Sequence, residues 1–165
     1  MRRAFSLLEV VIAVAIVAGS LMVALAALPA LLRQSAESAD LQVAQRLPAL
    51  IRLELERSAA AAGFDSLAAA IPVMGVPLQG GHPCVVTADG LRIQTGVSPT
   101  SIAAEEAYFL VELWRFNQVP LAFDAGAAVL PAYVRVSWPF HVHGDSAETP
   151  VDSRSSYCFA ISLAR

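Results

Sequence analysis

The sequence predicts an α+β protein in which a long N-terminal helix packs on a C-terminal antiparallel β-sheet. Two observations carry this prediction. Apolar residues recur at helical spacing up to about Ala62, and five short runs of strand-like composition follow. At 165 residues the chain has the length of one ordinary domain. Its high apolar content of 56% is concentrated in the first 32 residues, and the composition beyond them is ordinary.

The first predicted element is an apolar helix over residues 5–30. Phe5 to Leu28 contains 24 residues. As a helix this run extends over about 36 Å, which is enough to cross a hydrocarbon core of about 30 Å. Arg2 and Arg3 precede it, and the positive-inside rule places that end in the cytoplasm. Everything after the span is then expected to lie outside the cytoplasm.

Glu9 is the unusual residue of this segment. A carboxylate at the centre of a bilayer costs about 2.5–3.5 kcal/mol on insertion scales, so such a residue is usually kept for a partner. Four interpretations compete: an ordinary secretory signal cleaved at Ala24-Leu25-Ala26, a twin-arginine signal, a plain membrane anchor, and a leader cleaved before the apolar run. Glu9 favours the last, because an ordinary signal or a plain anchor gains nothing from an early carboxylate.

The leader MRRA and the following Phe5-Ser6-Leu7-Leu8-Glu9-Val10 resemble the processing signal of type IV pilins and type II secretion pseudopilins. In that family a short basic leader ends in a small residue, and the mature chain starts with Phe and carries Glu at its fifth position. The resemblance implies a leader of residues 1–4, cleavage between Ala4 and Phe5 by a prepilin peptidase, and N-methylation of Phe5. The family normally has Gly before the cut, where this chain has Ala4.

The resemblance also implies a way of assembly. Cleavage creates a positive α-amino group at Phe5, and its pairing with Glu9 of a neighbouring subunit offsets the cost of burying either charge alone. A slip of one helical turn leaves a carboxylate unpaired in an apolar bundle, so the pair also fixes the register. Polymerisation then exchanges lipid contacts for helix–helix contacts around residues 5–30.

Residues 31–62 are predicted to continue the helix as an amphipathic segment. Apolar side chains recur at helical spacing, and the charged residues lie largely elsewhere. Gly63 is expected to cap the helix, whereas Pro29 and Pro48 are expected to interrupt it by kinking or locally unwinding it. The periodic apolar residues are Leu41, Ala44, Leu47, Ile51 and Leu55.

Residues 63–165 are predicted to form a globular head. An irregular connector over residues 64–82 precedes the strands, and Asp89-Gly90 signals a tight turn between the first two. Residues 139–155 are rich in Pro, Gly, Asp and Ser and are expected to form the turn of a long hairpin. One face of the sheet is expected to cover the apolar stripe of the helix. The predicted strands are Cys84–Thr87, Leu91–Thr95, Ala107–Phe116, Ala132–Trp138 and Ser156–Leu163.

Few residues of the head suggest chemistry. In an oxidising compartment Cys84 and Cys158 favour a disulfide, and two buried free thiols are the alternative. His141 and His143 are weak candidates for a metal such as zinc, with a solvated hairpin loop as the alternative, and no cofactor is expected. The sequence contains no nucleophile elbow and no glycine-rich phosphate loop, so it does not favour an enzyme.

The resemblance therefore implies a structural subunit of a type IV pilus or a type II secretion pseudopilus, and the VRVSW and SLAR strands resemble its minor subunits. We expect a single-pass inner-membrane protein with a cytoplasmic N-terminus and a periplasmic head, which later enters the filament. Expected partners are other pilin-like subunits, the prepilin peptidase, an inner-membrane assembly platform and membrane lipid. The formal charge of −3 argues against nucleic acid. The alternatives are an anchored or tip-located adhesin or binding module of the same apparatus, and a secreted hydrolase.

Overall fold

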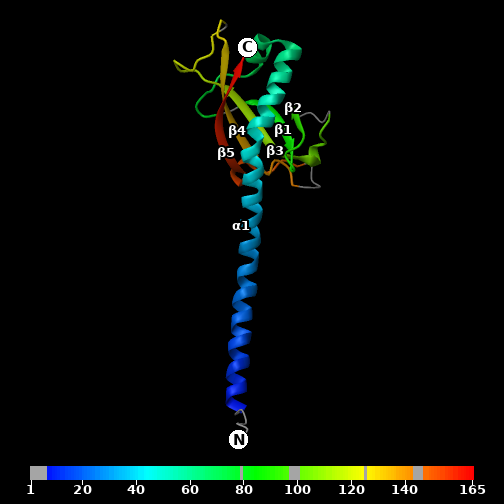
Figure 1. Ribbon diagram of the computed structural model, residues 1–165, viewed down its shortest axis with the longest axis vertical. Helices are drawn as coiled ribbons and strands as arrows, with labels where there is room; N and C mark the ends of the chain where they lie inside the picture. The colour runs from blue at the N-terminus through cyan, green and yellow to red at the C-terminus, as the bar shows by residue number, and fades with distance from the viewer. Residues whose placement is uncertain (1–6, 79, 97–100, 125, 143–146) are drawn as a thin grey trace. The chain divides into compact units, whose positions relative to one another are not determined.

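The computed structural model describes residues 7–78, 80–96, 101–124, 126–142 and 147–165 (Figure 1). The α+β prediction is confirmed, because a long N-terminal helix is followed by a five-stranded antiparallel sheet, a layout consistent with a pilin-like fold. The chain divides into two compact units, residues 1–40 and 41–165, and each is described by itself. The elements are α1 (Leu7–Ala62), α2 (Phe64–Ala70), β1 (His82–Thr87), β2 (Ile93–Thr95), β3 (Ala107–Arg115), β4 (Val129–Trp138) and β5 (Ser155–Ala164), with short 3₁₀ turns at Ala104–Glu106 and Val151–Ser153.

Helix α1 is continuous over 56 residues. The expectation that Pro29 and Pro48 locally unwind it is wrong, because both residues are helical, whereas a kink at either position remains a prediction. Proline has a helical φ and removes one backbone hydrogen bond, and here Ala and Leu neighbours, which are strong helix formers, carry the helix through both positions. The predicted end is confirmed: Gly63 has φ 91°, and its N–H donates to the Ala59 carbonyl at 2.8 Å.

The sheet has the order β2-β1-β3-β4-β5, and every neighbouring pair is antiparallel. All five predicted strands are present with shifted ends: β2 is shorter than predicted, and β4 begins at Val129. The expected turn at Asp89-Gly90 is confirmed, since Gly90 has φ 69°. The predicted irregular connector is corrected, because it contains α2, whose Leu67 and Ala68 are buried.

The core of the 41–165 unit forms between the second half of α1 and one face of the sheet, as predicted. Four apolar residues of α1 are essentially inaccessible to solvent and belong to the same cluster as the strand residues. A fully buried Leu or Ile stabilises the fold by about 1.5–3 kcal/mol relative to an exposed one. The helix contributes Ala44, Leu47, Ile51 and Leu55, and the strands contribute chiefly Phe109, Val111, Leu113, Leu130, Val134 and Val136.

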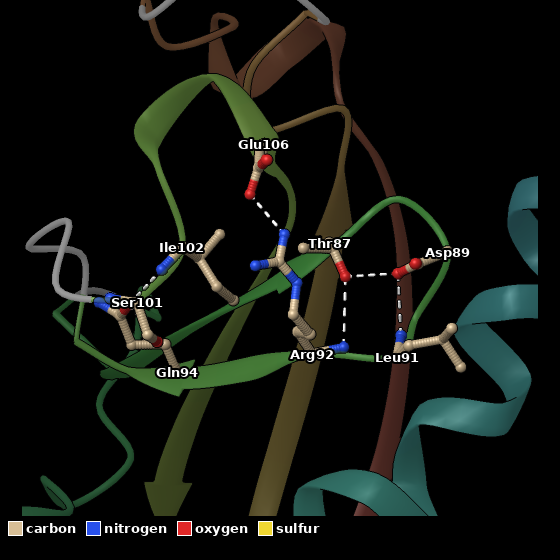
Figure 2. Close-up of polar contacts among 8 residues, drawn as sticks. All are labelled: Thr87, Asp89, Leu91, Arg92, Gln94, Ser101, Ile102 and Glu106. Atoms are coloured by element: carbon tan, nitrogen blue, oxygen red, sulfur yellow. Dashed lines mark hydrogen bonds and ion pairs between the residues drawn. The ribbon is translucent and has the colours of Figure 1, made fainter.

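The turn between β1 and β2 is held by side-chain hydrogen bonds (Figure 2). The Asp89 carboxylate accepts from the Thr87 hydroxyl and, at 3.0 Å, from the Leu91 N–H. The Thr87 hydroxyl oxygen accepts in turn from the Arg92 N–H at 3.3 Å. The Thr87 hydroxyl, and after it the Leu91 N–H, favour the ionised carboxylate and lower the pKa of Asp89.

Gln94 closes the β2 side of the sheet (Figure 2). Its buried side-chain oxygen accepts from the Ser101 N–H at 2.8 Å, from the Ser101 hydroxyl at 3.0 Å and from the Ile102 N–H at 2.8 Å. Since a buried amide without partners would be costly, these three bonds fix the chain at Ser101–Ile102 beside the short strand.

We expect Gly90→Ala to destabilise the protein more than Gly63→Ala. Both glycines have positive φ, which costs an alanine about 1–2 kcal/mol. At Gly63 an added Cβ would meet nothing within 4 Å, whereas at Gly90 it would lie 2.8 Å from Cγ1 of Val43 on α1. Such overpacking adds about 1–3 kcal/mol. Urea unfolding of the two variants checks this difference, and equal losses of stability would refute the close approach of the turn to the helix.

His82 should make the protein sensitive to acid. It is half-buried, and its Nε2 has no hydrogen-bond partner among the described groups. Burial lowers the pKa of His82 below 6.5, and the hydrogen bond to the backbone of Ala70 opposes this only in part. The unfolded chain therefore binds a proton more readily. The contribution of neutral His82 to the free energy of unfolding is complete above pH 6.5. It is lost as the pH falls toward the lowered pKa of His82 in the folded protein.

Urea titrations between pH 7.5 and pH 5 of the original protein and of His82→Leu measure this effect. The variant should lose less stability on acidification. The same pH dependence in both proteins would show that another group is responsible.

Candidate functional site

The most distinctive surface is the apolar N-terminal part of α1, residues 7–32, called here the apolar segment. All its residues are exposed, and an 18-residue window has a mean hydropathy of 2.7 with none of it buried. Its length is about 39 Å at 1.5 Å per residue, so it is long and apolar enough to cross a membrane. The large exposed side chains are Leu7, Leu8, Val10, Val11, Ile12, Val14, Ile16, Val17, Leu21, Met22, Val23, Leu25, Leu28, Leu31 and Leu32.

An apolar surface of this size does not stay in contact with water in a soluble monomer. The apolar segment is therefore a candidate membrane span by its length and composition. This reading rests on the residues of the segment and does not depend on any family resemblance.

Two polar side chains occur in the apolar segment, Ser20 and Glu9. The Ser20 hydroxyl donates to the Val17 carbonyl at 2.9 Å, so its polar group is satisfied within the helix. Glu9 is exposed and lies in the first turn of α1, where the helix dipole favours a negative charge. It is the one ionisable side chain that the segment presents to whatever covers it.

The predicted processing residues, Ala4 and Phe5, lie outside the described residues. Cleavage between them, methylation of Phe5 and the pairing of its amine with Glu9 of a neighbour remain predictions.

A second polar feature lies on the face of the sheet opposite α1. Glu112 alternates along β3 with core residues, so it points to this outer face. The Arg135 guanidinium donates to its carboxylate at 2.6 and 3.1 Å and stacks over the Trp114 ring at 5.2 Å. A cavity of about 310 Å³ adjoins this pair, lined by Leu110, Glu112, Arg135, Ser137, Glu148, Val151, Arg154 and Ser156.

Arg154 closes the other side of this cavity. Its side chain is 6% exposed, donates to the Thr149 carbonyl at 2.7 Å and to Glu148 at 3.4 Å, and lies over the Phe140 ring at 5.0 Å. Because each arginine of the cavity already faces a glutamate, we interpret the arrangement as a clamp that holds the segment before β5 against the sheet. Sequence reasoning missed it, since the partners come from different strands and loops.

The predicted disulfide between Cys84 and Cys158 is wrong for a single chain, and both thiols are free. Cys84 is on β1 and Cys158 on β5, with two strands between them, a separation of about 14 Å at 4.8 Å per strand. A disulfide needs Cα atoms within about 7 Å. They also face opposite sides of the sheet, since Cys84 pairs with core residue Val111 and Cys158 with Arg135. The alternative of two buried thiols fails as well, because Cys158 is exposed.

The histidine candidates gain no ligand set. His141 is buried rather than solvated, and its Nδ1 lies 3.2 Å from the Ala107 carbonyl oxygen. His143 lies outside the described residues. Within the part of the chain that the structure describes, no three His, Cys, Asp or Glu side chains gather where they could hold a metal ion.

Comparison with known protein families, with curated proteins and with solved structures found no significant match for this chain.

The two thiols should differ sharply in reactivity. Cys158 is exposed, whereas burial raises the pKa of Cys84 to about 12 and keeps its thiol protonated. Maleimide labelling of the native protein followed by mass spectrometry should modify one thiol, at Cys158. Labelling in denaturant should modify both without prior reduction. If reduction were required for any labelling, the two cysteines would be oxidised.

Proposed function

We propose that the protein is a structural, minor-type subunit of a type IV pilus or a type II secretion pseudopilus. The observation that carries this proposal is the fully exposed apolar segment with its single carboxylate, Glu9. The family resemblance of the leader and the α+β layout support it. In this role the head supplies a folded surface, and the apolar segment supplies the means of assembly.

The exposure of the apolar segment supports two successive environments. Before assembly, lipid would cover it as a single span, and Arg2 and Arg3 would keep the N-terminus in the cytoplasm with the head in the periplasm. After cleavage by a prepilin peptidase, an assembly platform would move the subunit into a bundle of like helices. Lipid tails and apolar side chains are similarly apolar, so moving the apolar segment from lipid into a bundle of like helices costs little free energy.

Glu9 would give this exchange its direction and register. In lipid the carboxylate carries a desolvation cost. In the filament it would be offset by the α-amino group of Phe5 on a neighbouring subunit. Ser20 makes no such demand, because its hydroxyl is bonded to Val17 inside the same helix.

We expect Glu9→Leu and Glu9→Gln to insert into the membrane normally but to enter filaments poorly. Breaking a buried ion pair costs about 3–5 kcal/mol, so incorporation should fall at least tenfold. Ser20→Ala, a matched change in the same segment, should assemble like the original protein. The measurement compares the amount of each protein in membranes and in sheared filaments, in cells that carry the assembly machinery.

The intact mass of the filament form reports processing in the same experiment. A chain that begins at methylated Phe5 supports the proposal. Equal incorporation of the Glu9 variants would refute the charge pair, and a mature chain that begins after Ala26 would refute the proposed function in favour of an ordinary secretory signal.

A further inference from the structure

The edge strand β5 has an open side. It contains ten residues, and among the described residues it pairs with β4 alone. The opposite edge is different, because β2 has three residues and the Gln94 side chain fixes Ser101 and Ile102 beside it (Figure 2). Proteins usually guard a long edge strand, since its free backbone groups are a template for another strand.

The last residue pair of β4 and β5 shows which residues of β5 direct their backbone groups to β4. The Arg165 N–H donates to the Ala128 carbonyl at 2.8 Å, one position beyond the pair Val129–Ala164. In an antiparallel pair the hydrogen-bonded positions alternate, so the odd-numbered residues of β5 direct their N–H and C=O groups to β4. The even-numbered residues direct theirs away from the sheet: Ser156, Cys158, Ala160, Ser162 and Ala164. No backbone group of these five has a partner within the described parts of the chain.

The side chains of β5 carry none of the usual guards. No charged residue and no proline lies between Arg154 and Arg165. On the inner face Tyr157, Phe159 and Ile161 are half-buried at the rim of the core, so part of each apolar side chain is still accessible. The outer face carries small residues, which are exposed from Ser156 to Ala164.

We propose that the free edge of β5 binds an extended, uncharged segment of another protein as a sixth strand. The five outward residues offer backbone donors and acceptors at the spacing of a strand, and a polypeptide backbone in β conformation satisfies them all. Apolar residues at alternate positions of the partner would cover the accessible sides of Tyr157, Phe159 and Ile161. A charged segment would gain no ion pair along the edge.

A second copy of this chain fits the edge less well than a different partner. Antiparallel pairing of two β5 strands requires a two-fold axis perpendicular to the sheet. Within the 41–165 unit α1 and β5 run in the same general direction (Figure 1), so this axis would set the two helices antiparallel, against the common direction of subunits in one filament. Parallel pairing of two β5 strands about a two-fold axis sets identical residues opposite each other. In a parallel pair, a residue that directs its N–H and C=O to the partner lies opposite a residue that directs its own groups away. This arrangement would therefore need backbone groups of β5 that are already bonded to β4.

A free peptide is a suitable probe, because it carries no helix. We would use the β5 sequence with serine in place of Cys158, SSYSFAISLA, followed by lysines for solubility. Paired antiparallel about Ala160, it sets Phe159 opposite Ile161 and Tyr157 opposite Leu163, which are favourable cross-strand neighbours. Binding of the labelled peptide to the full chain in detergent micelles is measured by fluorescence anisotropy.

Ala160→Pro removes an outward N–H that the fold does not use, since proline is tolerated at such an edge position. It should weaken peptide binding at least about tenfold, while Ala160→Thr, which keeps the N–H, should stay within about twofold. Ala160→Lys keeps the backbone N–H but adds a charge, which is one of the usual guards of an edge strand, so it should also weaken binding. Slow amide exchange at Phe159 and Ile161, which face β4, verifies that each variant is folded.

Three outcomes would overturn the proposal: no binding of the peptide to the original protein, equal binding by Ala160→Pro, or a dimer of the full chain that Ala160→Pro dissociates. The last would assign the edge to a second copy. Peptide binding does not require filament assembly, so its failure leaves the proposed function standing.

Discussion

The burial of one stripe of α1 against the sheet is the interaction on which the rest of the 41–165 unit depends. Ala44, Leu47, Ile51 and Leu55 lose nearly all contact with solvent, and the inner-facing residues of the strands close over them. The β1–β2 turn packs closely against the same helix, since a side chain at Gly90 would meet Val43 of α1. The same helix carries an apolar surface in residues 7–32 that nothing within its own unit buries. One helix thus holds two apolar surfaces: the 41–165 unit buries one of them, and the residues of the other are exposed within their own unit.

The inner face of the sheet, part of its outer face and its β2 edge are covered, each by a different kind of interaction. Its inner face is covered by apolar side chains of α1, and part of its outer face by the pairs Glu112–Arg135 and Glu148–Arg154. At the β2 edge a single buried amide, Gln94, satisfies three donors of the neighbouring chain. The edge of β5 lacks such a device within the described residues, and its outward groups come from small, uncharged residues. This contrast makes the open edge informative, because the rest of the sheet is well guarded.

Local patterns predicted the helix, the five strands and the turn at Asp89-Gly90, because hydrophobic periodicity and turn preferences depend on residues that are close together in the sequence. The misses have non-local causes. The separation of Cys84 from Cys158 depends on strand order, which places two strands between them. The outer-face clamp depends on the register that sets Glu112 opposite Arg135. His141 was expected in a solvated loop, yet it is buried beside Ala107 of β3. Helix α2 was hidden by the prolines and glycines that follow it, although its own sequence, FDSLAAA, is a good helix former.

The apolar segment and the edge of β5 differ in the kind of partner they select. Burial of apolar side chains is non-directional, so the apolar segment would accept lipid and helices alike, and within it only Glu9 discriminates between them. A strand edge is directional, because each N–H and C=O must meet its complement at a fixed spacing. The apolar segment therefore suits the exchange that we propose between a membrane and a filament, and the edge of β5 suits the recognition that we propose of one segment in one register. If both proposals hold, assembly through the helix and recognition through β5 are separable, and a change at Ala160 would alter the partner bound by the head without altering the polymer that carries it.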